Sequence, residues 1–184
     1  EFSHCIFEQG GFDNASGSSY GPLCLSGSGA YSITDCRFRQ NAFTALHIKN
    51  SNGQSIIKNN VFDSNAAPIV FDNVLNGVMG LDTGNQFNSN TIQKYVVIGD
   101  FGNNYTIGSV IFRNTQLPYL ITYDQIFNLS LLDSVVFMPG TVFEFNGNYC
   151  FDFDDNMLVK SKGALNSPVV FKGTNPIKGA WSGL

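Results

Sequence analysis

The 184-residue sequence is poor in charge, tryptophan and histidine. Charged residues make up 13% of the chain, with one Trp and two His. Ten Lys and Arg are outnumbered by fourteen Asp and Glu, whereas a nucleic-acid-binding surface needs an excess of basic residues. No apolar run approaches the roughly 20 residues of a membrane-spanning helix. We therefore expect neither a nucleic-acid partner nor a membrane span.

The common catalytic and metal-binding motifs are also absent. The sequence contains no Gly-x-Ser-x-Gly, His-Glu-x-x-His or Gly-x-x-x-x-Gly-Lys pattern. His4 and His47 have no second ligand at metal-binding spacing. The cysteines form no Cys-x-x-Cys pair and are expected to be single buried thiols: Cys5, Cys24, Cys36 and Cys150. The sequence thus predicts no metal site, nucleophilic triad or nucleotide-binding loop.

The chain is instead rich in apolar residues and in turn formers. Hydrophobic residues make up 43%, including 17 Phe, and there are 19 Gly. A chain of this length and composition can bury a sizeable core, which argues against disorder. The many glycines suit tight turns better than long helices.

A repeat of about 24 residues runs through the first half. Phe7, Phe38, Phe62 and Phe87 lie in related segments and are 31, 24 and 25 positions apart. Short apolar runs at 23–25, 46–48, 69–71 and 96–98 advance at nearly the same spacing. The longer first interval contains a Gly- and Ser-rich stretch at 11–21, which we interpret as an inserted loop.

These short runs have the length and composition of β-strands, and no helical pattern separates them. Such a period predicts an all-β, single-stranded parallel β-helix with about 23–25 residues per coil and about seven coils. Alternation places two ladders of equivalent residues inside and one column outside. The inner ladders are Phe7, Phe38, Phe62 and Phe87, and Cys5, Cys36, Asn60 and Asn85; the outer column is Glu8, Arg39, Asp63 and Asn88.

We interpret residues 1–184 as one continuous β-helix segment. Residues 1–98 form the regular repeats, 99–116 an irregular connection, and 117–184 further coils, beginning with the apolar run at 117–122.

The second half resembles a known family. Met138-Pro139-Gly140-Thr141 and Trp181-Ser182-Gly183-Leu184 are similar to motifs of bacterial secreted and cell-surface right-handed β-helix proteins of the pectate-lyase-like superfamily, and residues 2–11 resemble another element of it. The resemblance implies a right-handed solenoid located outside the cell or on the bacterial surface. Because the last motif normally precedes the first element, we expect a slice of a longer chain that contacts neighbouring repeats.

This family hosts many activities, so the resemblance implies the fold more strongly than the function. We expect a non-catalytic module that serves as a scaffold, an adhesion surface or a glycan-contacting surface. The alternative is a polysaccharide lyase or glycoside hydrolase using Asp152, Asp154 and Glu144, because paired carboxylates can act as acid and base on a glycosidic bond. The same carboxylates can bind Ca²⁺, the one cofactor the sequence leaves open. The Gly-His-Gly and Arg-x-Lys signatures of the hydrolases of this fold are absent.

Tyrosines that flank loops are the remaining candidates, because sugar rings stack on aromatic faces. We expect exposed rings at Tyr20, Tyr31, Tyr105, Tyr119 and Tyr123. Tyr20 is the preferred ligand contact, since insertions into solenoid coils tend to gather on a binding side.

Overall fold

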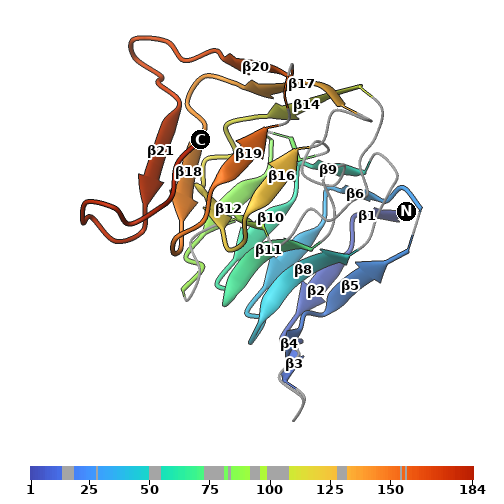
Figure 1. Ribbon diagram of the computed structural model, residues 1–184. Coiled ribbons are helices and arrows are strands. Elements are labelled where there is room, and N and C mark those ends of the chain that lie inside the picture. Colours follow the sequence, from blue (N-terminus) through green and yellow to red (C-terminus); the bar gives the residue numbers. More distant parts are fainter. Residues whose placement is uncertain are drawn as a thin grey trace.

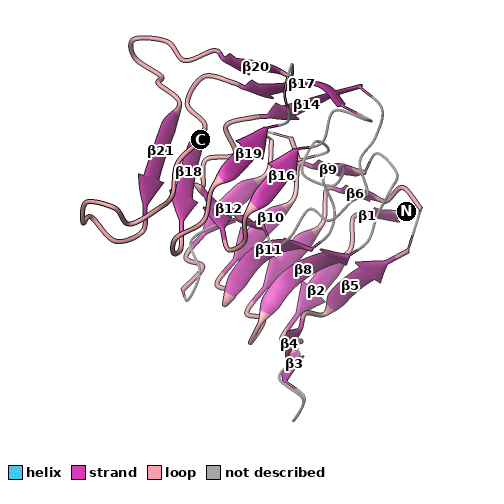
Figure 2. Ribbon diagram, in the orientation of Figure 1, coloured by secondary structure: helices cyan, strands magenta, loops and turns pink. Residues whose placement is uncertain are grey.

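The computed structural model describes residues 1–13, 19–27, 29–49, 55–72, 81–82, 84–91, 96–98, 108–127, 132–153, 155 and 157–184. Within these residues every regular element is a β-strand, and no helix is present that could cross a membrane. Strands of successive coils lie side by side and pair in parallel (Figures 1 and 2). The predicted all-β parallel β-helix is confirmed.

One seven-stranded sheet, the long sheet, runs through the whole stack (Figure 1). In spatial order its strands are β5 (Leu23–Ser26), β8 (Thr44–Lys49), β11 (Ala67–Asp72), β13 (Val96–Ile98), β15 (Tyr119–Ile121), β18 (Val142–Phe145) and β21 (Val170–Gly173). Leu46, Ile69, Val96 and Tyr119 are successive register partners on the core side. The second set of repeats predicted from the sequence therefore forms this sheet.

The other sheets divide the molecule into two parts. The first stack comprises the sheet of β1 (Phe2–Ser3), β6 (Ser32–Thr34) and β9 (Ile56–Lys58), and the sheet of β2 (Ile6–Glu8), β7 (Arg37–Arg39), β10 (Val61–Asp63) and β12 (Gln86–Asn88). The second stack comprises β14 (Gly108–Phe112), β17 (Leu132–Phe137) and β20 (Leu158–Ser161), together with β16 (Gln125–Phe127) and β19 (Phe151–Phe153). Strand β14 lies in the segment expected to be an irregular connection, and it pairs in parallel with β17, with a register shift between Gly108 and Ser109.

The predicted phenylalanine ladder fills the interior of the first stack. Phe7, Phe38, Phe62 and Phe87 are register partners in β2, β7, β10 and β12. Their rings stack nearly parallel, with centroids 4.8 Å apart from Phe7 to Phe38 and from Phe38 to Phe62. This distance is the spacing between neighbouring strands, so each ring contacts the next without displacing the backbone.

Two asparagine ladders satisfy the backbone at the bends of the first stack. Asn60 Oδ1 accepts the Cys36 N–H at 2.9 Å, and Asn60 Nδ2 donates to Ile33 O and to Asn85 Oδ1. Because these amides are buried, such bonds remove the penalty of leaving polar groups unpaired. The Cys5, Cys36, Asn60, Asn85 ladder was predicted. A second ladder, made in the same way by Asn41, Asn65 and Asn90, was not.

The residue before each of these ladder positions often has a positive φ. Examples are Asp35 (54°) and Asn59 (56°) at one bend, and Gln40 (55°) and Ser64 (56°) at the other. Left-handed backbone is uncommon outside glycine, and Asn and Asp tolerate it best. The bend at Asp35 is thus a recurring feature of the coils.

The second stack has a different interior. Its core is an aromatic cluster in which rings meet edge to face as well as stacked: Phe112, Tyr119, Phe137, Phe143, Phe145, Phe151, Phe153, Phe171 and Trp181. At the bend that precedes β18 of the long sheet, Thr141 is buried and donates its hydroxyl hydrogen to Met138 O at 2.7 Å. Packed aromatic side chains, rather than a column of asparagine amides, therefore fill this core.

The outer column of the first stack is arranged as predicted. Glu8, Arg39, Asp63 and Asn88 are register partners, and the Arg39 guanidinium pairs with the Glu8 carboxylate. Arg37 lies 3.8 Å from Asp63. Ion pairs this exposed add little to stability, about 0–1 kcal/mol each.

Candidate functional site

The carboxylates predicted for catalysis lie on different sheets. Glu144 is in β18 of the long sheet, on the side away from the core, and is 8% exposed. Its Oε1 lies 2.9 Å from Lys172 Nζ in β21. Asp152 is exposed in β19, whereas Asp154 lies outside the described residues. The structure therefore does not bring Glu144 and Asp152 onto one sheet, and Glu144 is already engaged in an ion pair.

Across the described parts of the chain, no group of three or more His, Cys, Asp or Glu side chains is arranged to hold a metal ion. Among these residues there is therefore no group of three or more carboxylates that could form the Ca²⁺ site left open by the sequence.

Tyr20 lies in the hairpin formed by the inserted loop. Its backbone in β4 pairs antiparallel with Phe12 in β3, and this hairpin projects from the stack (Figure 1). The side chain of Tyr20 is outside the part of the structure described, so its role stays a prediction.

The other predicted tyrosines have different surroundings. Tyr119 is only 1% exposed, and the expectation that it is exposed was wrong. It occupies a core position of β15, between Val96 and Phe143, and its hydroxyl donates to Arg113 O at 2.8 Å. Tyr31 is half-buried, and Tyr105 lies outside the described residues.

Tyr123 is the predicted tyrosine that is well exposed, at 59%, and it does not stand alone. Its ring stacks on that of Tyr149 with centroids 6.1 Å apart and planes 20° from parallel. Tyr123 precedes β16 and Tyr149 precedes β19, and these strands are register partners in neighbouring coils. We call Tyr123, Tyr149 and the polar residues beside them, Asp124, Asn148 and Asp152, the tyrosine platform.

Hydrogen bonds fix the backbone of the tyrosine platform. Asp124 Oδ1 accepts the Cys150 N–H at 3.0 Å and lies 3.5 Å from the Cys150 thiol. The Tyr149 carbonyl accepts the Ser182 N–H at 3.0 Å, and the Ser182 hydroxyl lies 2.8 Å from Asn148 Oδ1. The segment around Tyr149 is therefore held from the coils on both sides.

Burial raises the pKa of the Cys150 thiol, and the hydrogen bond to Asp124 and the charges of Asp124 and Asp152 raise it further. Two carboxylates, those of Asp124 and Asp152, therefore lie close to the tyrosine pair. Their negative charge disfavours the binding of an anionic ligand at this surface.

A histidine–carboxylate pair lies on the outer side of the long sheet. His47 Nε2 is 2.7 Å from Asp72 Oδ2, and this hydrogen bond is the main reason that the pKa of Asp72 is lowered. His47 stands in one column with Cys24 and Val70 and is only 6% exposed. Its Nδ1 is buried and has no hydrogen-bond partner among the residues that the structure describes.

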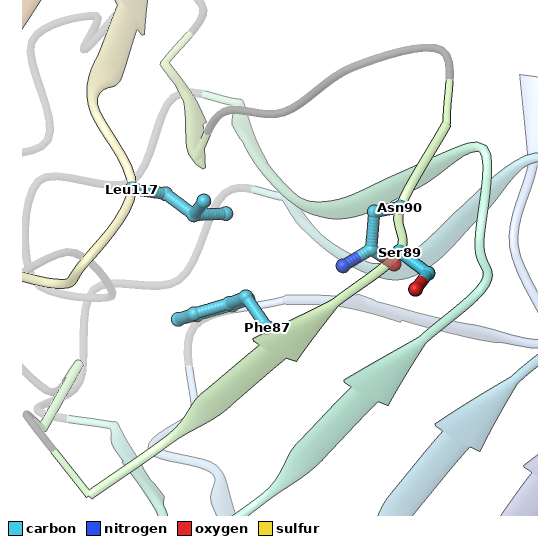
Figure 3. Close-up of a pocket in the computed structure, with 4 residues that line it drawn as sticks. All are labelled: Phe87, Ser89, Asn90 and Leu117. Carbon is cyan, nitrogen blue, oxygen red and sulfur yellow. The ribbon is translucent and has the colours of Figure 1, made fainter.

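A cavity of about 260 Å³ lies where the phenylalanine ladder ends. Phe87, Ser89, Asn90 and Leu117 line it, with the Phe87 ring and Leu117 on opposite sides of the space (Figure 3). Strand β12 is the last of its sheet, and β14 belongs to another sheet. The cavity is thus a consequence of the interruption between the two stacks.

Searches against family models, curated proteins and solved structures find no match to this chain. The class of protein rests on the fold itself: the chain is a parallel β-helix.

Proposed function

We propose that this protein is a non-catalytic β-helix module of a secreted or cell-surface bacterial protein, which binds saccharides at the tyrosine platform. The stack of coils serves as the rigid scaffold. The observation that carries the proposal is the stacking of the exposed ring of Tyr123 on the half-buried ring of Tyr149.

The ring geometry supports saccharide contact. The apolar C–H face of a pyranose packs on an aromatic face in the same way as other apolar rings do. Because Tyr123 and Tyr149 come from neighbouring coils, both rings are positioned by strand pairing rather than by a loose loop. Such a surface binds a ligand with little ordering cost.

The polar groups beside the rings support a particular class of saccharide. Asp124, Asn148 and Asp152 provide carboxylate and amide groups that hydrogen-bond to hydroxyls. Two carboxylates repel a polyuronate but attract an ammonium group. We therefore expect neutral or amino-bearing saccharides to bind better than acidic ones.

The lyase or hydrolase alternative has less support. It requires carboxylates that act on one bond, whereas Glu144 is paired with Lys172 on the long sheet and Asp152 is on β19. Cleavage of a polysaccharide by the protein would favour this alternative over our proposal.

The test is a glycan array followed by calorimetric titration with the best neutral or amino oligosaccharide. Tyr123→Ala and Tyr149→Ala should each weaken binding about two- to tenfold, since an aromatic contact contributes about 0.5–1.5 kcal/mol. Tyr123→Phe keeps the ring and should bind nearly as well as the wild type.

Ile56→Ala is the matched control, because Ile56 is a similarly exposed apolar side chain in the first stack. Loss of affinity in this variant, or wild-type affinity in both tyrosine-to-alanine variants, would reject the platform as the binding surface. Release of shortened products from any polysaccharide would instead support the enzymatic alternative.

A further inference from the structure

Two cysteines occupy neighbouring positions in one internal ladder. Ile6 of β2 pairs with Arg37 of β7, which places Cys5 directly beside Cys36 in the next coil. The Arg37 N–H donates to Cys5 O at 2.8 Å, and the Cys5 N–H lies 3.5 Å from Cys36 Sγ. The two residues are 31 positions apart in sequence but adjacent in space.

The two thiols also have the same local geometry. Each cysteine follows a residue with positive φ, His4 at 55° and Asp35 at 54°. Each thiol contacts the carbonyl two residues earlier, Cys5 Sγ with Ser3 O at 3.4 Å and Cys36 Sγ with Thr34 O at 3.2 Å. The side chains therefore point in the same direction, one coil apart.

This separation suits a disulfide bond. Neighbouring strands are about 4.8 Å apart, and Cα atoms joined by a disulfide are usually about 4.4–6.8 Å apart. The bond therefore needs the two thiols to turn toward each other and does not need the coils to move apart.

The rest of the ladder indicates what is unusual about these two positions. At the next positions Asn60 Oδ1 and Asn85 Oδ1 accept backbone N–H groups at 2.9 and 3.0 Å. Cys36 offers only a sulfur to the Cys5 N–H, and sulfur is a weak acceptor. Cysteine is thus a poorer ladder residue than asparagine, but two adjacent cysteines can form a covalent link.

We propose that Cys5 and Cys36 are a modification site at which a disulfide joins the first two coils when the protein meets a small disulfide oxidant. Both thiols are reduced in the structure. The inference does not depend on saccharide binding.

The chemistry is thiol–disulfide exchange with a compound such as oxidised glutathione. The half-buried Cys5 loses its proton and attacks one sulfur of the oxidant, forming a mixed disulfide and expelling one glutathione thiolate. Cys36 then loses its proton and attacks Cys5 Sγ, expelling the second. Two protein thiols are oxidised, one glutathione disulfide is reduced to two glutathione molecules, and the two thiolates take up the released protons.

Burial is the main reason that the pKa of the Cys36 thiol is raised, so the second step should accelerate as pH rises. The other cysteines lack such a neighbour. The register partner of Cys24 is His47, and that of Cys150 is Gly183.

The test incubates the full chain with mixtures of oxidised and reduced glutathione and follows its mass and its peptide map. We expect the loss of two hydrogens, a linked pair of peptides containing Cys5 and Cys36, and a thermal midpoint about 5–10 °C higher than in the reduced protein. Cys24→Ser and Cys150→Ser should give the same result.

The Cys5→Ser variant should keep the thermal midpoint of the reduced protein in every glutathione mixture. Because Cys5 is not fully buried, we expect this variant to fold. Persistent capping of Cys5 by glutathione without a Cys5–Cys36 link would overturn the proposal. So would a link involving Cys24 or Cys150, or four free thiols at the most oxidising ratio.

Discussion

The two stacks maintain one fold with two different interiors. In the first stack, Phe lies on Phe and, beyond the two cysteines, Asn lies on Asn, so that the asparagine side chains make the same bonds from coil to coil. In the second stack, rings of different strands meet edge to face around Phe137, and Thr141 replaces the bend asparagine. A coil of this kind can thus be stabilised either by repeated hydrogen bonds or by irregular aromatic packing.

The largest effect is expected from removing the central ring of the aromatic cluster. Phe137→Ala should lower the free energy of unfolding by about 4–5 kcal/mol, because the cavity opens among rings from several strands. Phe87→Ala, at the half-buried end of the ladder, should cost clearly less. Urea denaturation measures both, and equal losses would show that the second core is no tighter than the end of the first.

The next effect concerns the asparagine ladder. Asn60→Ala leaves the buried Cys36 N–H without its acceptor and removes the bonds from Asn60 Nδ2 to Ile33 O and Asn85 Oδ1, which should cost about 3–4 kcal/mol. Thr141→Val, at the corresponding kind of position in the second stack, should cost only about 1 kcal/mol. Asn88→Ala, on the outer column, is the control for a general loss of amide groups and should leave the unfolding midpoint nearly unchanged.

A smaller effect is expected at Tyr119, where the second stack places a polar group in its core. Burial raises the pKa of its hydroxyl well above the usual range, so this group stays a neutral donor to Arg113 O. Tyr119→Phe should lower the free energy of unfolding by about 1 kcal/mol. A variant as stable as the wild type would show that the aromatic cluster does not need this bond.

The smallest effect is electrostatic. The hydrogen bond from His47, aided by the positive charges of His47 and Lys49, lowers the pKa of Asp72 despite partial burial. A carboxylate with a lowered pKa in the folded state stabilises the protein above its unfolded pKa, and this contribution is lost as pH falls through the folded pKa. Asp72→Asn should therefore make thermal stability fall less steeply below about pH 4. If the variant lost thermal stability at acid pH as steeply as the wild type, the His47–Asp72 pair would make no contribution to stability.

Sequence reasoning succeeded where the repeat is exact. Phe38 and Phe62 share a strand motif, so their spacing alone predicted the stacked ring pair. The same spacing relates Asn41, Asn65 and Asn90, and attention to it would have identified the second asparagine ladder. Periodicity is informative here because each coil places equivalent residues in one environment.

Prediction failed where the environment is set by segments other than the repeat itself. Tyr119 begins a strand next to a proline and resembles a loop residue, yet strand register places it in the core. His47 lies on the outer side of the long sheet, but Asp72 and its surroundings leave it little exposed. Tyr149 was overlooked because its partnership with Tyr123 depends on the pairing of β16 with β19, which no sequence motif marks.

The long sheet has a mechanical consequence. Among the described residues it is the one sheet whose hydrogen bonds pass from the first stack to the second, through the pairing of β13 with β15. A force applied along the stack axis is therefore carried across this boundary by a short stretch of parallel backbone pairing. We expect single-molecule extension to separate the two stacks there before either unravels, so that the protein yields in two steps.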